Sequence, residues 1–245
     1  MIKFFRQIRY NLMNQNKASK YFKYAIGEII LVVIGILIAL SINNWNEEIN
    51  SKKKERLALI EILTDLEYNI VELDSVKSRR LGLLKSVNAL EILIETMETN
   101  KPYHDSLGIY FNTANSYDEA DFKISGYNSL NSIGMDLIED PKIRSSIGQY
   151  FTSSIADYKS AFNEVVKDFH EYMLPFMRKE FTLINMHKEN RALIPNDYEA
   201  LKNNKEYIQS LRTFLDVQSY YLNVLNLNLD NAVKLKQDMK EYINE

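Results

Sequence analysis

Few residues in this chain have the type and spacing that catalysis or metal binding requires. The sequence contains no cysteine, which excludes thiolate metal sites, cysteine nucleophiles and disulfides. The histidines are His104, His170 and His187, and no two of them have the spacing that places a pair of ligands on one helical face. We therefore interpret them as solvated or hydrogen-bonded side chains and predict no metal site.

An acidic cluster, Asp118, Glu119 and Asp121, lies in the least regular part of the sequence. A calcium loop would need further alternating oxygen ligands and a turn glycine, which are missing. The phosphate-binding loop, the dinucleotide fingerprint and the G-x-S-x-G nucleophile motif do not occur either. The sequence thus predicts a solvated loop here, no cofactor and no enzymatic activity.

Glu28 is the most informative ionisable residue, because it lies within a long apolar run. A helix would place it on the same face as Gly35 and Ala39, a small-x-x-x-small pair that lets two helices approach closely. Ionisable groups inside a membrane span usually face protein rather than lipid. One interpretation is a transmembrane interface with a second copy or a partner membrane protein, with Glu28 bonded across it. The other is that Glu28, near the start of the run, extends to the lipid headgroups.

The apolar run that would position these three residues covers 25–42 and reads AIGEIILVVIGILIALSI. At 1.5 Å per residue such a helix is roughly 27 Å long, close to the hydrocarbon thickness of a bilayer. Tyr21, Tyr24 and Trp45 flank it at the positions of an aromatic interface belt. The sequence thus predicts a transmembrane helix in a lipid bilayer, with these aromatic residues as interfacial anchors.

A cleaved signal peptide is the alternative interpretation of the same run. Ala39 and Ser41 offer small residues at the spacing of a cleavage site. However, the segment before the run is long for the basic part of a signal peptide, and the run exceeds the usual length of about 7–15 apolar residues. We therefore predict an uncleaved signal anchor.

The charge distribution predicts the orientation in the membrane. Residues 1–24 carry six basic residues and no acidic one, whereas residues 43–51 carry no Lys or Arg. By the positive-inside rule the N-terminus is cytoplasmic and the following domain lies across the membrane. In a bacterial inner membrane of the Gram-negative type the domain would be periplasmic. The basic residues within 52–56 reduce the contrast between the two flanks.

The basic segment and the rest of the chain suit different partners. Residues 3–12 (KFFRQIRYNL) fit an interfacial amphipathic helix on anionic lipid, and equally a disordered basic tail that only sets the topology. The net charge of −3 for the whole chain leaves −9 for residues 25–245. Because contacts with phosphate need clustered Lys and Arg, we predict that nucleic acid is not a partner.

Residues 43–245 form the predicted domain, and its composition favours long helices. The chain has only 7 Gly and 4 Pro, fewer than turn-rich β-domains usually need. We expect an unbroken helix from Asn46 to about Asn100, ended by Pro102. Its apolar seam comprises Leu59, Leu63, Leu66, Ile70, Leu73, Leu84, Val87 and Ile94.

Residues 103–140 should form a cap of short helices and loops, one helix near 105–115 and one over 125–133, closed by Gly134. Asp140 and Pro141 predict the start of a long helix that Pro175 kinks or splits. Its apolar face comprises Ile147, Phe151, Tyr158, Phe162, Val165, Phe169, Tyr172 and Phe176. The cap also has aromatic residues that we interpret as core, with a ligand pocket as the alternative: Tyr110, Phe111, Tyr117, Phe122 and Tyr127.

A capping box at Asn196 and Glu199 should open the last helix. Its seam comprises Ile208, Leu211, Leu215, Leu222, Leu225, Leu229, Ala232, Met239 and Ile243, interrupted by Gln218 and Lys236. Matching seams of this coiled-coil type predict an antiparallel bundle. The predicted fold class is therefore all-α: one N-terminal transmembrane helix, then an antiparallel bundle of long amphipathic helices with a cap of short helices and loops.

Two stretches carry a resemblance to a known family. They are YAIGEIILVVIGILIALSINNWNEE at 24–48 and SGYNSLNSIGMDLIEDPKIRSSIGQYF at 125–151. The chain resembles a family of single-pass helical membrane proteins of Gram-negative bacteria that is described only as a domain of unknown function. The resemblance implies the anchor and the helical fold, and it implies no activity.

We expect a membrane-anchored scaffold or protein-interaction module without catalytic activity. The segment 1–24 is too short for an output domain, so a stand-alone receptor kinase is excluded. The first alternative is a sensor-like bundle that binds a small ligand in the 103–140 cap and signals through a partner membrane protein. A hydrolase with an unrecognised site is the weaker alternative, because no nucleophile–base pair is evident.

Overall fold

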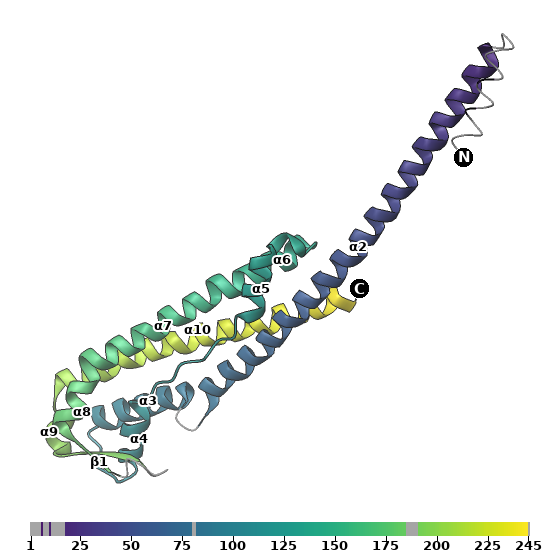
Figure 1. Cartoon of the computed structure of the whole chain (residues 1–245). Helices are drawn as coiled ribbons and strands as arrows, with labels where there is room; N and C mark the ends of the chain where they lie inside the picture. Colours follow the sequence, from purple (N-terminus) through teal and green to yellow (C-terminus); the bar gives the residue numbers. More distant parts are fainter. Residues whose placement is uncertain (1–5, 7–9, 11–17, 80–81, 185–190, 245) are drawn as a thin grey trace. The chain divides into compact units, whose positions relative to one another are not determined.

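The computed structural model describes Arg6, Tyr10 and residues 18–79, 82–184 and 191–244, most of which are helical (Figure 1). The chain divides into two units, Met1–Glu55 and Arg56–Glu245, and the first long helix contributes residues to both. The predicted helix 3–12 lies outside the described residues, apart from Arg6 and Tyr10. The α-helices are α2 (Ala18–Ser78), α3 (Leu83–Glu98), α4 (Leu107–Ala114), α5 (Ser125–Ile133), α6 (Pro141–Gly148), α7 (Ile155–Asp168), α8 (Leu174–Glu180), α9 (Tyr198–Lys202) and α10 (Lys205–Asn244).

The helix expected from Asn46 to Asn100 is interrupted, so that part of the prediction is wrong. Helix α2 ends at Ser78 and α3 begins at Leu83, after Gly82. A Cβ atom on Gly82 would lie 2.8 Å from the carbonyl oxygens of Val76 and Lys77, so only glycine fits this close return of the chain. The end near Pro102 is confirmed, since α3 ends at Glu98 and is followed by Asn100 at φ 56°.

The interruption also changes which face of the second segment is buried. Leu84, which we predicted in the seam, is exposed, because a helix that restarts after a turn does not keep the phase of the helix before it. Val87 is buried as expected. The buried residues of α3 are Leu83, Ser86, Val87, Ala89, Leu90, Leu93 and Met97.

Local signals placed the short helices of the cap correctly. Helices α4 and α5 occupy the expected positions, and Gly134 ends α5 with φ 122°, a left-handed conformation that favours glycine. The carboxylate of Asp140 accepts hydrogen bonds from the amides of Lys142 and Ile143 at 2.7 and 2.9 Å, and Pro141 occupies the first turn of α6. These elements follow from interactions between near neighbours in the sequence.

Two π-helical turns interrupt the long helix after Asp140: η2 (Gln149–Ser154) before α7 and η3 (Phe169–Met173) before α8. The second lies just before Pro175, which lacks the amide hydrogen that a regular α-helix would need there. The helix therefore changes from π to α geometry just before Pro175, and its residues stay helical on both sides of the proline. The assignment of Tyr172 to the apolar face was wrong, since Tyr172 is exposed and Met173 is buried instead. A π-turn adds one residue to a helical turn, so the residues after it face in different directions from those of a regular α-helix.

The described chain also contains a two-stranded antiparallel sheet, which the all-α prediction missed. Strand β1 (Phe181–Ile184) pairs with β2 (Ala192–Pro195), with Thr182 opposite Ile194. The buried side chains of Phe181 and Leu193 join the core, and the Phe181 ring packs edge-on against Phe111 at 5.0 Å between centroids. This burial stabilises a hairpin that is too short to be evident from its sequence pattern.

Asn196 does not cap the last helix, so the predicted capping box is wrong. Its amide donates to the carbonyl of Glu180 and its side chain accepts from the Thr182 hydroxyl, which closes the hairpin. Asp197 instead caps the short helix α9 by accepting from the amide of Ala200 at 3.0 Å. Asn204 then opens α10 by accepting from the amides of Glu206 and Tyr207.

The buried face of α10 lies beside the stripe that we predicted. Ile208, Leu215, Leu222 and Leu229 are only half-buried, whereas Leu211, Leu225, Ala232 and Met239 are buried as expected. The buried positions repeat every seven residues in two rows, the pattern of a coiled-coil seam. Those rows are Tyr207, Phe214, Tyr221, Asn228 and Leu235, and Leu211, Gln218, Leu225, Ala232 and Met239.

Helix α10 contacts α7 and α3, and in Figure 1 the yellow α10 runs beside the green α7 over much of its length. Two apolar cores lie along this second unit. The larger core joins α3, α4, α7, the hairpin, α9 and the first half of α10. The smaller core joins residues 58–66 of α2 with α5, α6, η2 and the last part of α10. Polar residues lie in the interior where the two cores meet, including Asn69 and Asn228.

Candidate functional site

The apolar run of α2 is exposed on all sides. Large apolar side chains from Ile29 to Ile42 are each about half exposed or more, and none of the most apolar window, with a mean hydropathy of 2.8, is buried. Complete burial of one such side chain is worth about 1.5–3 kcal/mol, so a run of this length in water would be strongly unfavourable. By length and composition this helix is a candidate membrane span.

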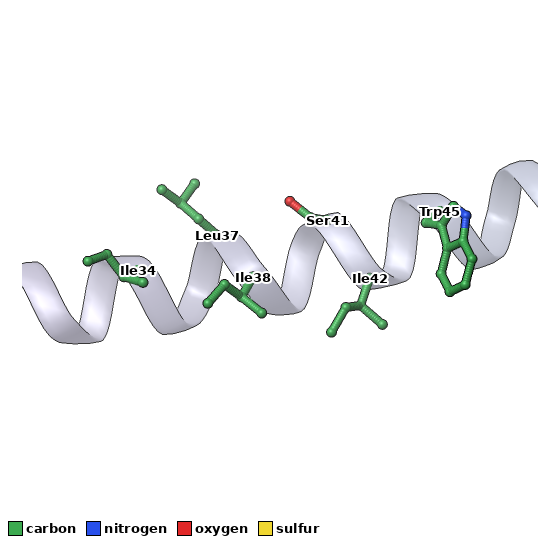
Figure 2. A pocket seen from close by; sticks show the side chains of 6 residues that line it. All are labelled: Ile34, Leu37, Ile38, Ser41, Ile42 and Trp45. Carbon is green, nitrogen blue, oxygen red and sulfur yellow. The ribbon is translucent and has the colours of Figure 1, made fainter.

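The side chains that line this part of α2 point outward around its axis. Figure 2 shows Leu37 and Ser41 projecting on one side of the helix and Ile38 and Ile42 on the other. Trp45, one of the three predicted interfacial anchors, is 64% exposed at the end of the run. Tyr21 and Tyr24 lie on the same helix, but their side chains lie outside the described part of the structure.

The predicted transmembrane interface residues lie on one helix, and two of them, Gly35 and Ala39, are open to their surroundings in the described chain. A Cβ atom added to Gly35 would meet no atom within 4 Å, and Ala39 is exposed. Glu28 is half-buried and lies two turns before Gly35. Space for a second helix therefore exists beside Gly35, which is the geometry that close helix–helix packing requires.

The second unit contains a polar arrangement that sequence reasoning did not find. Residues 116–124 connect α4 to α5 without forming helix or strand, and we call residues 115–126, which include the first two residues of α5, the strap (Figure 1). Side chains from three helices, α2, α7 and α10, form hydrogen bonds with it, in place of a neighbouring strand. On α2, the Asn69 amide group donates to the carbonyl of Lys123 at 3.0 Å and accepts from the same residue's amide at 2.8 Å.

Asp65, one turn before Asn69 on α2, holds the end of the strap. Its carboxylate accepts from the Ser125 hydroxyl at 2.9 Å and from the Gly126 amide at 2.6 Å, so it acts as an N-cap for α5 from a different helix. A Cβ on Gly126 would lie 2.8 Å from backbone atoms of Glu61 and Ile62. The glycine is therefore required for α5 to approach α2 this closely.

Helices α7 and α10 hold the other part of the strap, and α3 bonds to the residue before it. The Ser86 hydroxyl donates to the carbonyl of Ala114, just before the strap, and the Gln218 amide donates to the carbonyl of Ser116 at 3.3 Å. Tyr221 donates to the carbonyl of Asp118 at 2.9 Å, and the Ala120 amide donates to the Tyr158 hydroxyl at 2.8 Å. All four side chains are buried.

Tyr158 and Tyr221 are also hydrogen-bonded to each other. Because the only hydroxyl hydrogen of Tyr221 is donated to Asp118, Tyr158 must donate to Tyr221. The bonds thus run from the Ala120 amide through both hydroxyls to the Asp118 carbonyl, and they begin and end on the strap. Burial raises the pKa of Tyr158 to about 12 and also raises the pKa of Tyr221, so both phenols are neutral at physiological pH.

The acidic and histidine residues considered first do not come together. Asp118 forms an ion pair with Arg79 at 2.5 Å, and its carboxylate accepts from the Glu119 amide. His104 contacts Ser106, and His170 lies 3.5 Å from the Tyr117 hydroxyl. His187 lies outside the described residues. Within the described ranges, no group of three or more His, Asp or Glu side chains is placed to hold a metal ion.

The aromatic side chains of the cap pack into the interior. Phe111 is fully buried, Tyr117 contacts Phe162 and Phe169, and Phe122 packs edge-on against Tyr158. Tyr127 stacks on Phe151 with an interplanar angle of 5°. Tyr110 packs against the larger core. The rings therefore contribute to the cores, as our first interpretation of them required.

The described features define a mostly helical protein with one long apolar helix near its N-terminus. The chain belongs to a family of unknown function (DUF6090), whose model matches residues 28–152, which is more than half of the chain. No curated protein and no solved structure matches it. The predicted membership of an uncharacterised family is thus confirmed. The matched range contains the strap with Asp65 and Asn69, whereas Tyr158, Gln218 and Tyr221 lie beyond it.

Proposed function

We propose that this protein is a membrane-anchored scaffold or protein-interaction module without catalytic activity of its own. Residues 25–42 span the bilayer as an uncleaved signal anchor, and residues 43–245 form an antiparallel helical bundle that is presented to a partner. The observation that carries the proposal is the apolar run of α2, whose most apolar window has a mean hydropathy of 2.8 and no buried residue. Such an apolar surface is favourable when lipid surrounds it.

The basic residues before the span, and the absence of Lys and Arg from residues 43–51 directly after it, support a cytoplasmic N-terminus. The proposed location is therefore the inner membrane of a Gram-negative bacterium, with the bundle in the periplasm. A C-terminal reporter enzyme that is active only outside the cytoplasm tests this orientation. Activity of the fusion supports it, and activity of a reporter that works only in the cytoplasm contradicts it.

The scaffold function is better supported than a ligand sensor, because the aromatic rings of the cap pack against each other and against the cores. The proposed contact with a second copy or a partner membrane protein uses the face of Glu28, Gly35 and Ala39. Gly35→Leu fills the open space beside the helix and should weaken crosslinking of the full chain in membranes. Ile36→Leu, one position further around the helix, is the matched control. Equal crosslinking of both variants and the parent chain would exclude this face.

Membrane insertion itself is tested by extraction with alkaline carbonate. The full chain should stay in the membrane fraction, and a variant with Ile34→Lys and Leu37→Lys should be released, because each lysine at the middle of a span costs about 2.5–3.5 kcal/mol. The control carries Leu57→Lys and Ile60→Lys, two exposed apolar residues of the same helix outside the run. Release of the unchanged chain would refute the anchor.

A further inference from the structure

We propose that the strap, residues 115–126, opens and closes as a single unit, and that the closed strap couples α2 to α7 and α10. Its two ends are held by different helices. Asp65 and Asn69 of α2 hold the part from Lys123 to Gly126. Tyr158 of α7 and Tyr221 of α10 hold the part from Asp118 to Ala120. The inference concerns the second unit alone and does not depend on the proposed membrane function.

The contacts of the strap with the interior are hydrogen bonds and a few ring contacts. Of its larger or apolar side chains, Ala120 is buried, Tyr117 and Phe122 are partly buried, and Ile124 is exposed. Hydrogen bonds that open to water are replaced by bonds to water, so their net contribution is much smaller than their strength in an apolar medium. Leaving the closed position therefore exposes less apolar surface than the separation of any long helix would. This makes opening of the strap easier than unfolding of the unit.

The closed strap also leaves buried acceptors without a donor. The side-chain oxygens of Asn115 and Gln218 have no hydrogen-bond partner, although both residues are nine-tenths buried or more. A buried acceptor without a donor is destabilising, and opening would expose both oxygens to water. The closed state is thus held by specific bonds while it carries a penalty that opening would relieve.

Cooperative opening follows from how the bonds are distributed. The strap bonds to helix side chains rather than to a neighbouring strand, so its amides are protected by the helices that hold it. The amide of Ala120 donates to Tyr158, that of Lys123 to Asn69, and that of Gly126 to Asp65. Loss of one of these bonds frees the chain on both sides of it, since consecutive bonds are only three residues apart.

Hydrogen exchange of the full chain in detergent, read at single amides by mass spectrometry, tests this inference. The amides of Ala120, Lys123 and Gly126 should exchange together and faster than the buried amides of α7 and α10. Asn69→Ala removes the bonds to Lys123 and no bond to Ala120 or Gly126, yet it should accelerate exchange at all three amides by the same factor, roughly fivefold or more. Tyr158→Phe should likewise accelerate Gly126.

Tyr220→Phe is the matched control, because Tyr220 is the exposed neighbour of Tyr221 on α10, and it should leave all three amides unchanged. The proposal is overturned if each variant accelerates only the amide that it had contacted. It is also overturned if the strap amides of the unchanged chain exchange only when the whole unit unfolds, which is decided by the denaturant dependence of exchange. That second measurement needs no variant, so a variant that fails to fold does not leave the question open.

Discussion

Helix α2 contains two regions with the same backbone structure and different surroundings. Residues 29–42 are apolar around the whole helix apart from Ser41, and they are exposed. Residues 56–78 are amphipathic, and their inner face buries Leu59, Ile62, Leu66 and Leu73 together with the polar Asp65 and Asn69. The comparison teaches that hydrophobicity alone does not indicate a protein core. A helix that is apolar and exposed on all sides is a candidate membrane span, and a polar residue on the buried face of a helix indicates a specific protein contact.

The largest expected difference comes from the same substitution in the two regions. Leu66→Ala removes a side chain that is fully buried and should lower the free energy of unfolding of the second unit by about 2–5 kcal/mol. Leu37→Ala, which is 56% exposed, should leave it unchanged. Denaturant unfolding of both variants in detergent, followed by circular dichroism, measures the difference. Equal destabilisation would show that residues 25–42 also pack against protein.

A second matched pair uses two glycines. Gly126→Val places side-chain atoms against the backbone of α2 at Glu61 and Ile62 and should destabilise the second unit by about 3 kcal/mol. Gly35→Val meets open space and should have no effect on the same transition. The melting temperatures of the two variants provide the comparison. A Gly126→Val variant as stable as the parent chain would contradict the close approach of α5 to α2.

The polar side of the comparison is tested at Asp65. Asp65→Asn replaces the carboxylate that accepts from Ser125 and Gly126, and charged acceptors contribute more than neutral ones, so the expected loss is about 2 kcal/mol. Glu61→Gln, one turn earlier on the exposed face of the same helix, should change stability by less than about 0.5 kcal/mol. Chemical unfolding of both variants distinguishes the buried carboxylate from the solvated one.

The smallest expected effect is a loss of folding stability at alkaline pH. Because the pKa of Tyr158 is raised to about 12, the unfolded chain loses this proton near pH 10 while the folded chain keeps it. The contribution of the neutral Tyr158 phenol to the free energy of unfolding is complete below pH 10 and is lost as the pH rises towards 12. At pH 11 the free energy of unfolding should be lower by about 1 kcal/mol for this reason. Unfolding of Tyr158→Phe between pH 9 and 11 should show a correspondingly weaker pH dependence. An unchanged slope would contradict the buried phenol.

Sequence patterns identified the elements whose signals lie between near neighbours. The cap at Asp140, the end of α5 at Gly134 and the positions of α4 and α5 all follow from residues that interact within one turn. The patterns were less successful where the periodicity changed. The turn at Gly82 and the π-turn before Pro175 each shifted the helical phase, which moved Leu84 and Tyr172 out of the buried face.

The candidate site likewise has one part that the sequence predicted and one part that it did not. Residues 25–42 could be identified from composition, because any helix of that length and hydrophobicity exposes apolar side chains unless something covers them. The strap could not be identified, although Asp65 and Asn69 on the inner face of an otherwise apolar seam were a visible signal. Gln218 was interpreted as an interruption of the α10 seam, and it is instead a fully buried member that bonds to Ser116.

The sequence by itself therefore determined the helical composition, the apolar run and the helix ends at Gly134, Asp140 and near Pro102, since each depends on interactions that a short segment makes with itself or with its solvent. Only the tertiary structure decided the hairpin, the buried face of α10 and the partners of the strap. Asn69 and Lys123 are 54 residues apart, and Tyr158 and Tyr221 are 63 apart. Such contacts depend on how helices pack and not on local spacing, so no local pattern specifies them.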